Sequence, residues 1–214
     1  MPLQYRAVLL DMDGVIVDSL PLHYRTTAQV FASRGHRLSR AEYNEFFAGV
    51  TDKEGFATFC KRIGESDAST LMAQKTALFA QLAANGAFAH YPDTLAAIRW
   101  LAANNVPLAV VTGSLRAEAL HALQATGIQE ILQAIITADD ITHGKPHPEG
   151  YLKGARALGV APADCVVIED APAGIDAALA AGMRCIALTN TYPRAALRNA
   201  TRIVSRLQPS LFEQ

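Results

Sequence analysis

Short apolar runs alternate with segments of helical spacing along most of the chain. The runs that we interpret as strands are Arg6–Leu10, Val106–Val111, Ala134–Thr137, Cys165–Ile168 and Met183–Leu188. The segments that we interpret as helices are Thr94–Asn104, Arg116–Thr126, Glu149–Leu158 and Ile175–Ala181. Continuous apolar strands separated by helices are typical of a parallel sheet that is covered on both faces. This pattern predicts an α/β core of three layers.

Residues 18–88 have a different composition. Val30, Val50 and Ile63 are the only valines and isoleucines in this block, whereas it holds all but one of the eight phenylalanines of the chain. Strands favour β-branched side chains, and helices tolerate them less well. The block is therefore predicted to be helical throughout, as an insertion between residues 1–17 and 89–214, which form the core domain.

Helix boundary signals divide the block further. The segments Ser39–Glu42 and Thr51–Glu54 both fit the capping box, in which a hydroxyl and a carboxylate satisfy opposite backbone amides at a helix start. Gly49, Gly64 and Gly86 stand where helices are expected to end. We expect three to five short helices and no strand.

Composition narrows the classes of function. Of the 214 residues 50% are hydrophobic, so the chain can bury a sizeable core. The formal net charge is -1, which provides no basic surplus for binding nucleic acid or an anionic membrane. No run approaches the ~20 apolar residues of a membrane span. We expect neither nucleic acid nor a membrane as partner.

The cysteines indicate the compartment. Cys60, Cys165 and Cys185 lie far apart and form no CxxC pair. They are typical of buried thiols in a reducing compartment rather than of a disulfide or zinc framework. We expect a cytoplasmic protein, and nothing in the sequence demands more than a monomer.

Polar residues follow the predicted strands at the points where ligands bind in open α/β sheets. Asp11 and Asp13 come after the first run, Thr112-Gly113-Ser114 after the second, and Glu169-Asp170 after the fourth. Lys145 lies between the third run and its helix. One edge of the sheet would thus collect carboxylates, hydroxyls and an ammonium.

Such a cluster of carboxylates needs a cation, because like charges raise one another's pKa values. Oxygen ligands without His or Cys suit a hard ion, and a sparse set that leaves room for water and phosphate suits Mg²⁺. A lysine and a hydroxyl beside the ion would balance the charge of a phosphate. One carboxylate can attack phosphorus, and a second can move the proton.

Four segments together resemble the motifs of the haloacid dehalogenase-like hydrolase superfamily, in the same order and with similar spacing. They are Asp11-Met12-Asp13-Gly14-Val15, Val111-Thr112-Gly113-Ser114, Gly144-Lys145-Pro146-His147-Pro148 and Ile168-Glu169-Asp170-Ala171-Pro172-Ala173-Gly174-Ile175. The chain looks most like the branch that holds β-phosphoglucomutase and small phosphosugar phosphatases. The resemblance implies a Rossmann-like core and a helical cap that closes over the site.

The resemblance also implies a role for each matching residue. Asp11 would be the nucleophile and a Mg²⁺ ligand, and Asp13 the general acid and base, with its backbone carbonyl on the metal. Thr112, Lys145 and the backbone around Gly113 and Ser114 would hold the phosphoryl group. Asp170 would bind the metal, and Glu169 would be either a further ligand or a partner of the ligands.

The cap offers three further candidates for contact with the substrate. His23 stands where β-phosphoglucomutase-like proteins have a histidine that faces the substrate, although it also fits a partly buried helix position. Lys75 would reach a phosphate or hydroxyl, or else lie on a solvated helix face. Asp52 stands where the mutases carry an arginine that binds a second phosphate. This difference weakens the interpretation of the chain as a mutase.

The function expected from these residues is a Mg²⁺-dependent phosphatase for a small phosphorylated metabolite of the phosphosugar, phosphopolyol or phosphoglycolate type. It would act through an aspartyl-phosphate. A β-phosphoglucomutase-type mutase is the alternative among enzymes. A phosphoacceptor switch is the alternative of another class, but its acids, Thr and Lys come in a different order and it has no cap. A kinase is disfavoured because the sequence contains no GxxxxGK[ST] loop.

Overall fold

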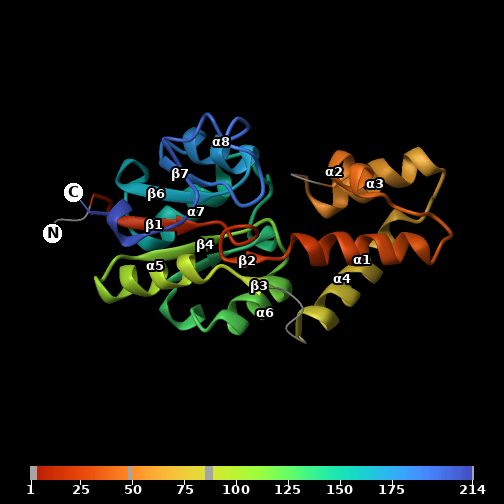
Figure 1. Cartoon of the computed structure of the whole chain (residues 1–214), viewed down its shortest axis with the longest axis horizontal. Helices are drawn as coiled ribbons and strands as arrows, with labels where there is room; N and C mark the ends of the chain where they lie inside the picture. The colour runs from red at the N-terminus through yellow and green to blue at the C-terminus, as the bar shows by residue number, and fades with distance from the viewer. Residues whose placement is uncertain (1–3, 48–49, 85–88, 214) are drawn as a thin grey trace. The chain divides into compact units, whose positions relative to one another are not determined.

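The chain forms two compact units in the computed structural model, which describes residues 4–47, 50–84 and 89–213 (Figure 1). One unit is Met1–Asp18 with Ala89–Gln214, and the other is Ser19–Phe88. The helical unit therefore starts one residue later than expected, because Asp18 belongs to a short strand.

The first unit is built on one parallel sheet of six strands. In spatial order they are β5 (Ala134–Ile136), β4 (Leu108–Val111), β1 (Ala7–Leu10), β6 (Cys165–Glu169), β7 (Arg184–Leu188) and β8 (Arg202–Val204). All five predicted strands are present. Strand β8 was not predicted, because it has only three residues and carries no apolar run.

Four helices connect the strands. They are α5 (Pro92–Ala103), α6 (Arg116–Thr126), α7 (Glu149–Leu158) and α8 (Pro172–Ala180), with 3-10 turns η1 (Gln129–Ile131), η2 (Ala138–Asp140), η3 (Pro162–Asp164) and η4 (Pro209–Leu211). Both α6 and α7 have the predicted bounds. Each ends at a glycine in the left-handed conformation, Gly127 after α6 and Gly159 after α7.

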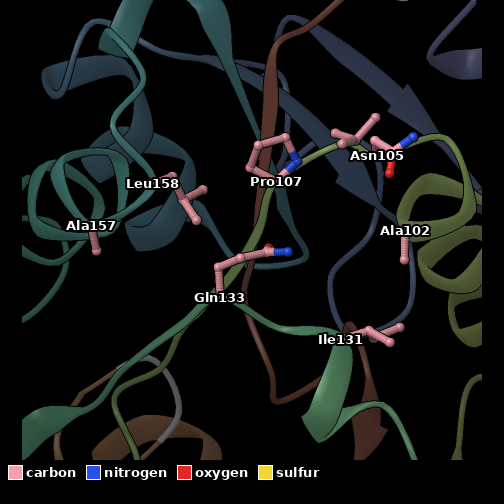
Figure 2. Close-up of a pocket in the computed structure, with 8 residues that line it drawn as sticks. Ala102, Asn105, Pro107, Ile131, Gln133, Ala157 and Leu158 are labelled. Carbon is pink, nitrogen blue, oxygen red and sulfur yellow. The ribbon is translucent and has the colours of Figure 1, made fainter.

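A hollow of about 380 Å³ opens at the edge where strands β4 and β5 begin (Figure 2). Pro107, Gln133 and Leu158 are among the residues that line it. This is the amino edge of the parallel sheet, whereas the predicted polar residues follow the carboxyl ends of the strands. The hollow therefore lies apart from them.

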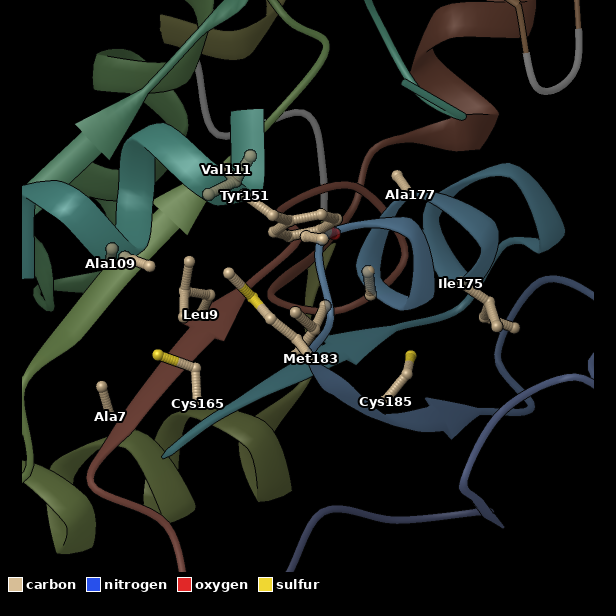
Figure 3. Close-up of a cluster of buried hydrophobic side chains, with 14 of the residues drawn as sticks. Ala7, Leu9, Ala109, Val111, Tyr151, Cys165, Ile175, Ala177, Met183 and Cys185 are labelled. Carbon is tan, nitrogen blue, oxygen red and sulfur yellow. The ribbon is translucent and has the colours of Figure 1, made fainter. Parts of the chain in front are cut away.

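The core beneath α7 and α8 is made of side chains from one face of the sheet (Figure 3). Leu9 of β1 and Val167 of β6 are fully buried there, against Tyr151 of α7 and Ile175 of α8. Successive strand residues point to opposite faces. Helix α5 buries Leu95, Ile98 and Leu101 and packs on β4, which completes the layered α/β architecture.

A short antiparallel ribbon carries the chain out of the first unit and back. Strand β2 (Val17–Asp18) pairs with β3 (Ala89–His90), so that Val17 faces His90. The amide of Tyr91 donates to the carbonyl of Ile16 at 3.0 Å and extends the pairing. The ribbon lies at the two predicted boundaries between the core domain and the inserted helical block. Phe88, the last residue of that block, falls outside the described residues.

The second unit contains helices α1 (Leu20–Ala32), α2 (Arg40–Phe46), α3 (Asp52–Ile63) and α4 (Ala68–Ala84). Both capping boxes form, at the starts of α2 and α3. Phe31 stacks on Phe56 and meets Phe59 edge-to-face in the core of this unit, which explains the concentration of phenylalanine in this block.

Helix ends in this unit follow the glycines only in part. Gly64 ends α3 in the left-handed conformation, as predicted. Gly49 and Gly86 lie outside the described residues, so the helix ends expected there stay predictions. None of the helices in the described ranges is long and apolar enough to cross a membrane.

Candidate active site

The sheet has its topological switch at β1, and the predicted site residues meet there. From β1 the chain continues to β4 and β5 on one side and later to β6, β7 and β8 on the other. Leu10 pairs with Val110 on β4 and with Ile168 on β6. The next residues therefore bring Asp11, Thr112 and Glu169 to one edge, which is where such sheets bind ligands.

Lys145 reaches this edge from the loop before α7. Its ammonium pairs with Asp11, donates to Glu169 Oε1 at 2.7 Å and lies 3.3 Å from the carbonyl oxygen of Val111. Burial alone would lower the pKa of Lys145, but the carboxylates of Asp11 and Glu169 raise it above its ordinary value. Lys145 is thus a fixed cation among the acids.

Glu169 is held by four donors. Lys145 and the hydroxyl of Tyr151 donate to its Oε1, the latter at 2.8 Å. The backbone amides of Asp170 and Ala171 donate to its Oε2 at 2.9 and 3.0 Å. Its side chain is almost fully buried, and this shell of donors satisfies the charge that burial would otherwise penalise.

Two glycines make room for the acids of this edge. Gly14 has φ +83°, and a Cβ there would overlap the carboxylate of Asp170. A Cβ on Gly174, in the first turns of α8, would overlap the carboxylate of Glu169. The close approach of backbone to both side chains therefore requires glycine at these positions.

Three buried carboxylates could share a metal ion. One oxygen each from Asp11, Glu169 and Asp170 lies within 4.8 Å of the others. Burial raises the pKa of Asp11 well above its usual value; Lys145 opposes this, and the neighbouring acids add to it. Burial and the charge of Glu169 also raise the pKa of Asp170. One ammonium does not balance three carboxylates, and the all-oxygen donors of this cluster fit a hard divalent cation.

Asp13 accepts hydrogen bonds from two hydroxyl groups that follow β4. Its Oδ2 accepts a hydrogen bond from Thr112 Oγ1 at 3.2 Å and one from Ser114 Oγ at 2.9 Å. The backbone amide of Ser114 donates to Thr112 Oγ1 at 3.0 Å. Gly113 is exposed, with open space around its Cα. The motif after β4 thus fixes the orientation of Asp13.

The three candidates of the helical unit also meet one another. The ammonium of Lys75 on α4 lies 2.6 Å from Asp52 Oδ2 and 2.9 Å from His23 Nδ1. The ring of His23 stacks on Phe79, with the ring centroids 4.3 Å apart. Lys75 is fully buried, so the solvated helix face that its position also allowed is excluded.

The family model for haloacid dehalogenase-like hydrolases matches residues 5–182. The chain is a haloacid dehalogenase-like hydrolase. Two relatives are 34% identical to this hydrolase. The validoxylamine A 7'-phosphate phosphatase of Streptomyces hygroscopicus subsp. limoneus aligns over 95% of this chain and 94% of its own length. Hexitol phosphatase A of Escherichia coli K12 aligns over 86% and 82%.

Solved structures have the same architecture as this hydrolase. CbbY from Rhodobacter sphaeroides, as an Asp-to-Asn mutant with xylulose-(1,5)bisphosphate, has a TM-score of 0.87 at 28% identity and covers 94% of both chains. A β-phosphoglucomutase from Clostridium difficile has a TM-score of 0.82 at 25% identity, and the match covers 97% of this chain and 93% of that one. The fold and the branch suggested by the motifs are confirmed.

Two residues at the site of this hydrolase were not predicted from its sequence. Tyr151 is fully buried, and its hydroxyl donates to Glu169. Asn190, beyond β7, donates from Nδ2 to the carbonyl oxygen of Gly14 at 2.7 Å. A buried tyrosine on the core face of a helix needs a partner for its hydroxyl, a signal that could have revealed Tyr151.

Proposed function

We propose that the chain is a Mg²⁺-dependent phosphatase for small phosphorylated metabolites of the phosphosugar, phosphopolyol or phosphoglycolate type. The observation that carries the proposal is the convergence of Asp11, Asp13, Thr112, Lys145 and Asp170 at the switch point of a haloacid dehalogenase-like hydrolase. The relatives that are 34% identical are named validoxylamine A 7'-phosphate phosphatase and hexitol phosphatase A, which supports a small phosphorylated substrate.

The residues around the proposed cation site have different roles. Asp11, Asp170 and the backbone carbonyl of Asp13 would hold Mg²⁺, which when bound neutralises the charge of the phosphoryl group and of the acids. We assign to Glu169 the orientation of Lys145, because its Oε1 accepts from the ammonium of Lys145 at 2.7 Å and from the hydroxyl of Tyr151 at 2.8 Å. Lys145 would pair with a phosphoryl oxygen.

The proposed chemistry has two displacements. A carboxylate oxygen of Asp11 attacks phosphorus, and the bond from phosphorus to the leaving oxygen breaks while Asp13 gives that oxygen a proton. Water then attacks phosphorus while Asp13 takes a proton from it, the bond from phosphorus to the Asp11 oxygen breaks, and inorganic phosphate leaves. Thr112 and Ser114 hold the carboxyl group of Asp13 in place for both transfers.

We assign substrate selection to the helical unit, which acts as the cap. The buried Lys75 with Asp52 and His23 forms a polar group that suits hydroxyls of a sugar or polyol. Asp52 would be a poor partner for a second phosphate, which argues against a mutase. Cys60, Cys165 and Cys185 are free thiols, which supports a cytoplasmic location.

The test is a screen for phosphate release over phosphosugars, phosphopolyols and phosphoglycolate with Mg²⁺, beside an assay for isomerisation of β-glucose 1-phosphate. Many phosphates released per chain from one substrate class, and loss of release when Mg²⁺ is chelated, would support the proposal. Isomerisation without release would favour the mutase. One phosphate bound per chain without turnover would favour the switch.

A further inference from the structure

The loop between η2 and α7 brings two histidines and a glutamate together on the surface. His143 and His147 are exposed, and their rings lie with centroids 4.7 Å apart at a tilt of 36°. One ligand atom each from His143, His147 and Glu149 lies within 4.8 Å of the others. These residues do not belong to the carboxylate cluster of the active site.

Glu149 is the fixed member of the three. Its carboxylate accepts hydrogen bonds from the amides of Thr142 and His143 at 3.1 and 2.9 Å, and from Lys153 at 2.7 Å. These hydrogen bonds hold the carboxylate in one orientation, so a cation could bind it without rearranging the side chain.

One histidine nitrogen lies against the carboxylate of Glu149, and a nitrogen of the other histidine lies against its backbone amide. His143 Nδ1 lies 3.3 Å from Glu149 Oε2, and the amide of Glu149 donates to His147 Nδ1 at 3.3 Å. Two ligands at about 2.0–2.1 Å from a tetrahedral Zn²⁺ stand roughly 3.3 Å apart. The first pair thus already has the separation that such an ion requires.

We propose that His143, His147 and Glu149 form a binding site for a transition-metal cation such as Zn²⁺. Two imidazoles with one carboxylate suit Zn²⁺ and similar ions, whereas Mg²⁺ prefers oxygen ligands. Water fills the remaining position, because the site is open to solvent. The site is separate from the proposed hydrolysis and does not rest on it.

The bound ion acts on the loop that carries Lys145. Two of its ligands flank Lys145 in the chain, and the third begins α7, so the ion cross-links residues 143–149. Lys145 reaches Asp11 and Glu169 from this same loop. Metal at the surface therefore restrains the segment that presents the phosphate-binding lysine.

Titration calorimetry with Zn²⁺ on the whole chain, with Mg²⁺ in excess, tests the site. We expect His143→Gln and His147→Gln each to weaken Zn²⁺ binding by about tenfold or more. His121→Gln changes an exposed histidine on α6 and is expected to bind as the unaltered chain does. Circular dichroism checks that each variant is folded.

Hydrogen exchange provides the second readout. Zn²⁺ is expected to slow exchange of the amides of residues 142–150 in the unaltered chain, but not in His147→Gln. Equal Zn²⁺ affinity in all three histidine variants would overturn the proposal. So would Zn²⁺ binding that Asp170→Asn removes and His147→Gln leaves intact, because the ion would then lie at the active-site carboxylates.

Discussion

The hydroxyl of Tyr151 donates to Glu169 Oε1 at 2.8 Å, from inside the hydrophobic core. Burial raises the pKa of this hydroxyl well above its usual value, and Glu169 adds to the effect, so Tyr151 stays a donor at any working pH. Lys145 shares the same carboxylate oxygen and lies over the tyrosine ring, 5.1 Å from its centroid. The core of the sheet thus positions the cation of the site.

Replacing Tyr151 by phenylalanine tests this support. Tyr151→Phe removes one of the four donors to Glu169 and is expected to cost about 1–2 kcal/mol in the free energy of unfolding. We expect phosphate release to fall by about tenfold, because Glu169, which positions Lys145, loses one of the donors that hold it. Tyr24→Phe is the control: it loses a 3.3 Å bond to the carbonyl of Leu38 in the helical unit. If both variants keep full activity, Tyr151 has no positioning role.

Gly174 provides a steric test of the same carboxylate. Alanine is favoured over glycine within a helix by roughly 1 kcal/mol, but here its Cβ would overlap Glu169. We expect Gly174→Ala to lower kcat by about tenfold or more. Gly154→Ala, whose Cβ would press on Leu9 and Val111 in the core, should lower stability and leave kcat unchanged. Equal kcat in the two variants would contradict the argument.

The polar group of the helical unit should govern the choice of substrate. Lys75→Met and Asp52→Asn each break the 2.6 Å ion pair between these residues. We expect kcat/KM for the best phosphosugar or phosphopolyol to change by about tenfold or more, with little change for a small aryl phosphate. Lys61→Met, an exposed position on α3, should change neither. Parallel losses on both substrates would refute a role in specificity.

The loop before α7 should contribute stability in a pH-dependent way. Glu149 has a pKa lowered from 4.5 to about 2 by Lys153 and by the amides of Thr142 and His143. A lowered pKa gives stability that is complete above the unfolded value and disappears as the pH falls towards about 2. Urea unfolding with a chelator present should show Glu149→Gln less stable than the unaltered chain at pH 7, with the gap narrowing below pH about 4.5. The exposed Glu130→Gln should show no gap, and a gap for Glu149→Gln that is constant with pH would contradict the assignment.

Much of the fold follows from local patterns in the sequence. The strands that form the centre of the sheet are continuous apolar runs, and α6 and α7 have clear boundaries. The capping boxes locate two helices of the second unit because their donors and acceptors are three residues apart. By contrast β8 is stabilised by its pairing with β7, which local sequence does not encode.

The site residues that follow the ends of strands could be predicted from the sequence. The contacts between residues far apart in the chain could not. Asp11, Thr112 and Glu169 follow from strand ends, since parallel strands share one carboxyl edge. The bond between Tyr151 and Glu169 spans 18 residues, and that between Lys75 and His23 spans 52. No periodicity predicts such pairs, so the burial of Lys75 became visible only in the folded unit.

The central claim is that Asp11 carries the phosphoryl group. The most direct test is steady-state phosphate release, with Mg²⁺, by the unaltered chain and by Asp11→Asn on the best substrate of the screen. The account predicts many turnovers for the unaltered chain and a loss of at least about a thousandfold for a variant that remains folded. Release by folded Asp11→Asn within about tenfold of the unaltered rate would contradict the covalent mechanism.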